Sequence, residues 1–246
     1  MRTTITRRLL DVATAGTALV AALALAGCGS AGPAATPTQP AAAATSSTPA
    51  PSATTSPVDL VAQVGLTDTD LANGYTVKLM DGGDQVGGQV TLDNCGYDFT
   101  TEAHRVARRQ VILLTAQGQP AGASNEVVAY DSPDSAAQAL TQFRTSVTGC
   151  PKGTFEKSTV AGVPDRRYDV STVTASASLP VKDNAVATLD VSAKGSNEKL
   201  FVVLIFQRKG AVLDGTYLQM TTKPTAVDVA AVTQLATISG KRLAAA

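Results

Sequence analysis

The sequence predicts an α+β fold, in which an antiparallel β-sheet packs against two main helices and one disulfide joins two parts of the domain. Several runs of β-branched and aliphatic residues are bounded by Gly, Asn or Pro, which is typical of strands. Two longer segments carry helix caps together with an apolar stripe. Separate layers of strands and helices around one core are the expected arrangement.

The N-terminus predicts a secretory signal peptide over residues 1–27. Arg2, Arg7 and Arg8 precede an apolar run over residues 12–27, which is the layout of an export signal. A helix of about 16 residues at ~1.5 Å per residue is shorter than the roughly 30 Å hydrocarbon core of a bilayer. We therefore expect this segment to be cleaved rather than kept as a membrane span.

The cleavage site predicts lipid attachment at Cys28. Residues 25–28 read Leu-Ala-Gly-Cys, which matches the lipobox of bacterial lipoproteins. In that pattern a diacylglyceryl group joins the Cys28 sulfur, and two acyl chains give a stable membrane anchor. The expected location is the extracytoplasmic face of the cell membrane, with an ordinary secreted protein as the alternative.

A tether is expected over residues 28–57. After Cys28 it contains only Ala, Pro, Thr, Ser, Gly and Gln, so it cannot bury enough apolar surface to offset its ordering entropy. Residues 58–246 are expected to form one globular domain.

The first elements predicted in the domain are a short helix and a β-hairpin. Residues 67–74 predict a short helix, because Thr and Asp start it and Asn-Gly ends it, and residues 75–77 are expected to be extended. Residues 105–117 predict a strand, and residues 126–130 its hairpin partner across a turn marked by Gly and Pro.

The clearest helix prediction starts after Ser132. Ser132 suits the N-cap, Pro133 the first helical position, and Gly149 the end. Apolar residues at spacings of four, three and four form one stripe for packing on a sheet. They are Ala136, Leu140, Phe143 and Val147.

The second half predicts four strands and a terminal helix. The strands are expected over residues 167–174, 185–193, 200–207 and 211–220. Residues 201–206 are apolar on both faces, which predicts a central strand covered on both sides. Pro224 is expected to open the helix and Gly240 to lie near its end. The stripe expected to pack on the sheet is Val227, Ala231, Leu235 and Ile238.

The three cysteines predict one disulfide. With Cys28 assigned to lipid, Cys95 and Cys150 are the remaining pair in an oxidising compartment. Closing a loop of about 55 residues contributes on the order of 4 kcal/mol to stability, so a structural role is expected. The cysteines are too few for a zinc site, and His104 is the sole histidine. No metal or cofactor is expected.

Charge gives no reason to expect nucleic-acid binding. The predicted signal peptide carries three Arg and one Asp of the chain's 20 basic and 20 acidic residues, which leaves a net charge near −2. Residues 104–109 form one basic cluster, in which Arg105, Arg108 and Arg109 are the candidate contacts for an anionic ligand or lipid headgroup. The alternative is a solvated strand edge.

No catalytic machinery is recognisable. Ser196 and Lys199 fit the S-x-x-K spacing of penicillin-recognising enzymes, but they lie in a predicted hairpin turn rather than on a helix. His104 has no evident nucleophile and carboxylate to complete a triad. We therefore expect a protein that is not an enzyme.

Several weak motifs coincide in order along the domain. They are residues 66–71 leading to Gly74-Tyr75, Cys95-Gly96, Arg108-Arg109-Gln110, Asp131-Ser132-Pro133 and Lys209-Gly210. With the lipobox and tether, they make the chain resemble actinobacterial lipoproteins that carry a domain like the extracellular sensor of the serine/threonine kinase PknH. The resemblance implies an α+β fold with a ligand-binding cleft. The chain departs from that sensor in having one available cysteine pair where the sensor is expected to have two disulfides.

Three functions follow as hypotheses. The first is a non-catalytic binding or sensor module for an envelope lipid or other small ligand. The second is an accessory lipoprotein that binds an envelope protein, and the third is an envelope hydrolase. A ligand carried from the native host favours the first, cross-linking to one partner the second, and activity lost on one Ser or Asp substitution the third.

Overall fold

The computed structural model describes residues 55–72, 74–157 and 164–246 of the chain. The predicted signal peptide, Cys28 and the tether up to residue 54 lie outside the described residues. The described part confirms the α+β class, with one seven-stranded antiparallel sheet and helices packed against it. No helix among the described residues is both long enough and apolar enough to cross a membrane.

All strands of the sheet pair antiparallel, in the order β1-β2-β3-β7-β6-β5-β4. Their bounds are β1 Tyr75–Leu79, β2 Arg105–Thr115, β3 Pro120–Tyr130, β4 Arg166–Thr174, β5 Asn184–Ala193, β6 Lys199–Lys209 and β7 Val212–Met220. The hairpin partner of β2 is longer than predicted, because Pro120 already pairs with Leu114 at the end of a short turn.

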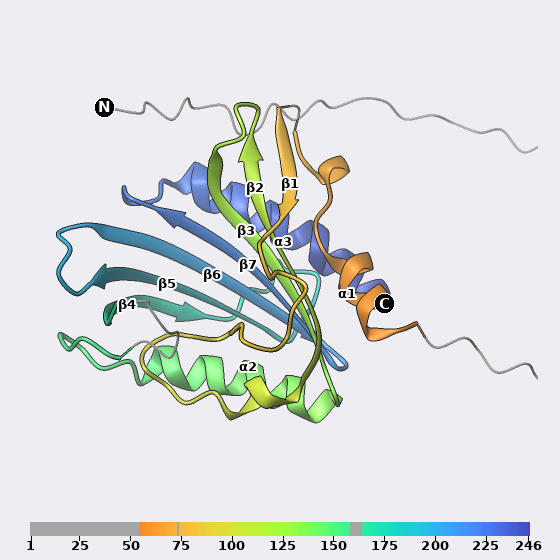
Figure 1. Ribbon diagram of the computed structural model, residues 1–246, viewed down its shortest axis with the longest axis horizontal. Coiled ribbons are helices and arrows are strands. Elements are labelled where there is room, and N and C mark those ends of the chain that lie inside the picture. The colour runs from red at the N-terminus through yellow and green to blue at the C-terminus, as the bar shows by residue number, and fades with distance from the viewer. Residues whose placement is uncertain (1–54, 73, 158–163) are drawn as a thin grey trace, which may run out of the picture. The chain divides into compact units, whose positions relative to one another are not determined.

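Helices cover both faces of the sheet (Figure 1). Helix α2 (Pro133–Thr148) packs on one face, where its predicted stripe is buried against strand residues that include Val128 and Phe206. Helices α1 (Pro57–Val64) and α3 (Ala226–Ala245) pack on the other face. Alternate residues along a strand point to opposite faces, so Val127 contacts the second group of helices while Val128 contacts α2.

The described helices and strands together form the hydrophobic core of the domain. The hydrophobic clusters join α1, α2 and α3 to strands of the same sheet, and they run from Val61 to Leu243. The chain from Thr55 onward therefore contains both the sheet and the helices that bury it.

Helix α1 was not predicted. Ser56 is its N-cap and accepts a hydrogen bond from the Asp59 backbone N–H at 3.1 Å, while Pro57 takes the first helical position. This is the same Ser-Pro start that predicted α2. The predicted tether ends at residue 57, so the cap and first residue of α1 were assigned to the tether, and residues 58–64 were assigned to the domain without a helix.

The short helix predicted over residues 67–74 is one 3-10 turn at Asp68–Asp70. The Asp70 carboxylate accepts a hydrogen bond from the Thr67 backbone N–H at 2.7 Å and pairs with Arg242 of α3. The cap was therefore predicted correctly, but the helix length was wrong because Leu71 already adopts an extended conformation.

Helix α3 packs through Ala231, Leu235 and Ile238 of the predicted stripe, but it differs from the prediction at Val227 and at its end. Val227 is 67% exposed, and the helix continues past Gly240 to Ala245. The buried positions are mostly small: Ala231, Val232, Ala236, Ser239, Gly240 and Leu243. A Cβ at Gly240 would lie 2.4 Å from Gln207 Oε1. Small residues therefore face the sheet because α3 approaches Gln207 closely.

A long segment, residues 80–99, connects β1 to a 3-10 turn at Thr100–His104 and passes over the sheet (Figure 1). Its start extends the pairing of β2, because the Gln110 N–H donates to the Gly83 carbonyl at 2.7 Å. A Cβ at position 83 would lie 2.4 Å from the Gln110 carbonyl oxygen, so only glycine permits this approach. The segment carries one wall of the site described next.

Candidate functional site

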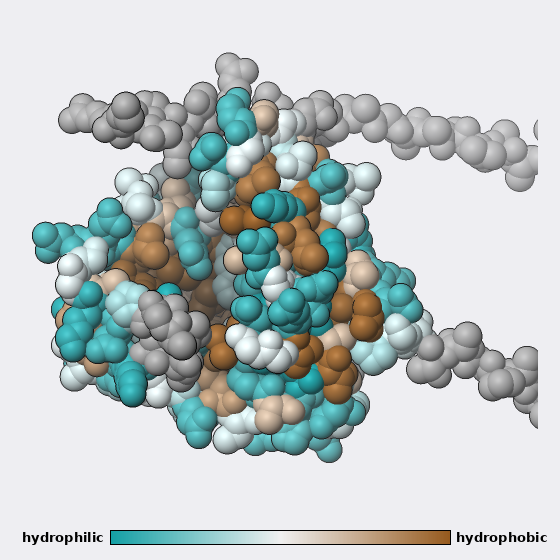
Figure 2. All heavy atoms as spheres, viewed as in Figure 1, coloured by the Kyte–Doolittle hydropathy of each residue, from teal (hydrophilic) through white to brown (hydrophobic). Residues whose placement is uncertain are grey.

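A cleft of about 440 Å³ opens on the sheet face that carries α2. Its volume lies within the range of small-molecule sites, ~300–1,000 Å³. Figure 2 shows a hollow with hydrophobic side chains over strands β5 to β7. The floor consists of alternate residues of β5 and β6, namely Leu189, Val191, Ala193, Leu200, Val202, Leu204 and Phe206.

The strand register places these side chains on one face. Val191 pairs with Leu200 and Leu189 pairs with Val202, and directly paired residues point to the same side of a sheet. Helix α2 covers one end of this row, where the rings of Phe143 and Phe206 lie 4.5 Å apart. At the other end Leu200 is 37% exposed. The expectation that residues 201–206 are covered on both sides is confirmed for residues 202–206, which are all buried, whereas Phe201 is only partly buried and the cleft opens beside Leu200.

Residues 90–94 form the wall of the cleft and are tied to three other elements. The backbone N–H groups of Thr91 and Leu92 donate to the Glu102 carboxylate at 2.9 and 3.1 Å. The Asn94 side-chain amide donates to Ser146 Oγ of α2 at 2.6 Å. From β4, Tyr168 OH donates to the Asp93 carbonyl at 3.3 Å. These bonds hold the wall over the floor without a ligand.

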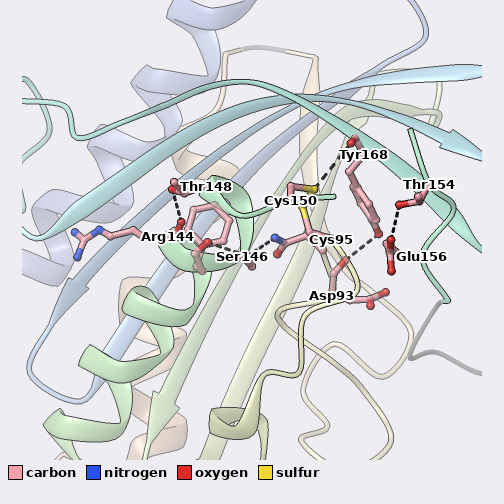
Figure 3. The surroundings of a disulfide bond; sticks show 11 residues. Asp93, Cys95, Arg144, Ser146, Thr148, Cys150, Thr154, Glu156 and Tyr168 are labelled. Carbon is pink, nitrogen blue, oxygen red and sulfur yellow. Dashed lines mark hydrogen bonds between the residues drawn. A yellow bond between two sulfur atoms is a disulfide. The ribbon is translucent and has the colours of Figure 1, made fainter. Parts of the chain in front are cut away.

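The predicted disulfide is confirmed and lies directly after the wall. Cys95 and Cys150 are joined at an S–S distance of 2.09 Å (Figure 3). The bond links the end of the wall segment to the residue that follows the C-cap of α2. Figure 3 shows Tyr168 and Asp93 beside it, so covalent and hydrogen-bond attachments meet at one corner of the cleft.

A buried ion pair lies behind the wall. Arg108 Nε lies 2.5 Å from Glu126 Oε1, and both side chains are almost completely buried. The Glu126 carboxylate also accepts hydrogen bonds from Thr91 Oγ1 at 2.8 Å and from Tyr217 OH at 3.1 Å. Burial, and next the Glu126 charge, raise the pKa of Tyr217 well above its usual value. Tyr217 therefore acts as a neutral hydrogen-bond donor at the edge of the cleft.

The three arginines predicted as ligand contacts are placed in different surroundings. Arg105 pairs with Glu102 at 3.1 Å and donates to the Val86 and Gln89 carbonyls, so it holds the wall segment. Arg108 pairs with Glu126 and donates to the Gly82 carbonyl at 3.0 Å.

Arg109 lies on the opposite face of β2, beside Gly65 at the end of α1. Its buried Nε has no hydrogen-bond partner among the described residues. None of the three lines the cleft, and ligand binding by them stays a prediction.

The charged residues that line the cleft lie near its mouth. Arg166 Nη1 is 4.0 Å from Asp93 Oδ2, and Glu198 lies in the exposed turn before β6. One positive and two negative side chains give this part of the cleft no excess of positive charge.

The sequence motifs considered for catalysis do not form catalytic arrangements in the described chain. Ser196 and Lys199 flank the β5–β6 turn as predicted, and Lys199 pairs with Asp190 at 3.1 Å. His104 Nδ1 lies 2.8 Å from Asp131, whose other oxygen accepts a hydrogen bond from Ser135 Oγ. The carboxylate thus separates the hydroxyl from the imidazole, whereas a triad requires the imidazole in the middle. Within residues 55–246 as described, no group of three possible metal ligands is found.

The residues of the cleft floor were missed at the sequence level. Leu, Val and Phe in a strand have the same pattern whether a helix or a ligand covers them. Only an indirect signal was available. The run in β6 is apolar on both faces, whereas the sequence predicted a single helix between β3 and β4 to cover one of them.

Comparison with known proteins gives limited information. No family model matches the chain, and no curated protein matches it. Among solved structures, the extracellular domain of PknH from Mycobacterium tuberculosis matches with a TM-score of 0.40 and 13% sequence identity, over 68% of this chain and 78% of that chain. A match at this level assigns no function to the chain.

Proposed function

We propose that this protein is a lipid-anchored, extracytoplasmic binding module without catalytic activity, and that its cleft takes the apolar part of a small envelope ligand. The observation that carries the proposal is the cleft of about 440 Å³, whose apolar floor on β5 and β6 continues beyond the part packed under α2 to the partly buried Val191 and the exposed Leu200. Covering apolar surface is favourable by roughly 25 cal/mol per Å². The wall is already fixed by the disulfide and by hydrogen bonds, so little ordering entropy opposes binding.

A cleft-filling substitution tests the binding part of the proposal. Val191 lines the cleft from β5 and is half-buried, so Val191→Trp places an indole in the space a ligand would occupy. We expect binding of a neutral apolar dye to weaken at least about tenfold. Val227→Trp makes the same change at a 67% exposed position of α3 and should leave dye binding unchanged.

Circular dichroism of both variants controls for folding. The chain contains no tryptophan, so each variant also reports the surroundings of its new side chain by fluorescence. Equal dye binding by a folded Val191→Trp variant and by the unmodified chain would contradict the proposed site.

The anchor is proposed from the lipobox at residues 25–28. A diacylated Cys28 would keep the protein at the membrane after export. We expect Cys28→Ser to abolish incorporation of labelled palmitate and to move the protein out of the membrane fraction. Unchanged labelling of the variant would exclude Cys28 as the lipid site.

A further inference from the structure

The cleft has a polar edge as well as an apolar floor. On the same face of the sheet, at the side of the cleft away from β5, four polar residues line the cleft. This polar strip consists of Thr91, Gln110, Tyr217 and Gln219. Its link to the floor follows from the register, because Tyr217 pairs with Leu204 and Gln219 pairs with Val202. A molecule on the floor would therefore meet the strip at one side.

The polar strip carries no net charge. Arg108 and Glu126 lie behind it, but their side chains are 2% and 1% exposed and their opposite charges are 2.5 Å apart. The hydroxyls of Thr91 and Tyr217 already donate to Glu126. A charged head at the strip would lose its hydration without meeting an opposite charge that is free to pair with it.

Two carboxamides remain open toward a ligand. Gln110 Oε1 accepts a hydrogen bond from Arg108, while its Nε2 donates to no described residue. The exposed Gln219 side chain makes no hydrogen bond within the described chain. An amide offers both donors and acceptors, which suits hydroxyl groups.

The size of the cleft limits the apolar part of the ligand. At the ~30 Å³ that a water molecule occupies in the liquid, 440 Å³ has room for about fifteen small groups of similar volume. That is sufficient for one alkyl chain and part of a head group.

We propose that the ligand is a single-chain amphiphile with an uncharged, hydroxyl-rich head, whose chain lies on the β5–β6 floor and whose head meets Gln110 and Gln219. This inference rests on the proposed function and adds the chemical class of the ligand. The mouth argues against an anionic head in particular, because Asp93 and Glu198 outnumber Arg166 there.

A panel of three octyl compounds tests the head group. Octyl glucoside, octyl sulfate and octyltrimethylammonium share one chain and differ in charge. Each is added below its micelle-forming concentration to the secreted chain from Gly29 to Ala246 loaded with N-phenyl-1-naphthylamine. We expect the glucoside to displace the dye at about tenfold lower concentration than either ion.

A matched pair of substitutions locates the preference. Gln219→Leu removes the amide that has no hydrogen bond within the described chain, and Gln117→Leu makes the same change in the exposed β2–β3 turn. We expect Gln219→Leu to reduce the preference for the glucoside at least threefold while Gln117→Leu leaves it unchanged. An unchanged preference in a folded Gln219→Leu variant would overturn the assignment of the strip.

The outcomes separate this inference from the proposed function. Displacement by all three compounds at similar concentrations, or best by an ion, would overturn the uncharged head while leaving an apolar cleft. Failure of the dye and of every octyl compound to bind would contradict the proposed function itself.

Discussion

Asp214 is the residue whose environment departs most from that of a typical carboxyl group. It lies on β7 and is fully buried under α3. No cation contacts it among the described hydrogen bonds and ion pairs. Burial raises its pKa to about 6, and hydrogen bonds from Ser239, Asn125 and Gln207 limit the rise. Asp214 therefore makes the stability of the fold dependent on pH.

The sign of that dependence follows from the pKa values. Below pH ~4 the carboxyl group is protonated in both states. Between pH ~4 and ~6 the unfolded chain loses its proton while the folded chain keeps it, so the free energy of unfolding falls as pH rises. The interval from 3.8 to about 6 corresponds to ~3 kcal/mol.

Asp214→Asn should remove this dependence. We expect the unfolding free energy of the variant, relative to the unmodified chain, to increase by up to ~3 kcal/mol between pH 4 and 7. Urea denaturation at a series of pH values measures it. Other titrating groups such as Glu102 and Asp183 are present in both proteins and cancel in the difference. A difference that stays constant with pH would show that Asp214 titrates normally.

At the residue scale, the sequence predicted the covalent link but not the partners of the arginines. Cys95 and Cys150 were identified because the third cysteine had another role. Arg108 could not be assigned in the same way, because its partner Glu126 lies on the next strand and becomes a neighbour only through the β2–β3 register. A basic cluster in sequence therefore did not become a basic patch on the surface.

At the element scale, the wall depends on the disulfide that joins it to α2. Residues 90–94 have no regular strand or helix of their own, so their position depends on side-chain bonds and on Cys95. Helix α2 supplies both the Ser146 contact and the residue next to Cys150. Loss of the disulfide should therefore affect the wall before it affects the sheet.

The double variant Cys95→Ala/Cys150→Ala tests this role. The bridge closes a separation of 55 residues, so the chain-entropy estimate predicts a loss of ~4 kcal/mol in unfolding free energy. Relative to the unmodified chain, we also expect amide hydrogen exchange to accelerate more in residues 90–94 than in β6, and dye binding to weaken. Protection of the wall equal to that in the unmodified chain would show that the hydrogen bonds alone hold it.

Elements were predicted best where local signals agree with packing. The caps and apolar stripe of α2 were sufficient to place it, and the strands of the second half differ from their predicted bounds by one or two residues. The predicted stripe of α3 is correct for the buried Ala231 and for Leu235 and Ile238, which pack against a core cluster, but wrong for the exposed Val227. The prediction also missed the close contact of Gly240 with Gln207, where a small residue faces the sheet. Such tertiary contacts override a simple hydrophobic period.

At the scale of the whole domain, the cleft follows from a mismatch between sheet and helix. Seven strands at ~4.8 Å spacing spread over ~29 Å, whereas one helix is ~10 Å wide. Helix α2 and the segment over residues 80–99 cover part of this face, and the end of β5 and β6 stays open. The sequence could predict the layers but not this remainder, because it depends on where α2 lies across the sheet.

Native mass spectrometry of the secreted chain from Gly29 onward, exported from an actinobacterial host, tests the central claim most directly. The same sample is measured again after denaturation. We predict a discrete additional mass on the folded protein that is released on denaturing and is absent from the Val191→Trp variant. A folded protein that carries no additional mass would contradict a ligand-binding cleft and would favour the prediction of an envelope protein partner.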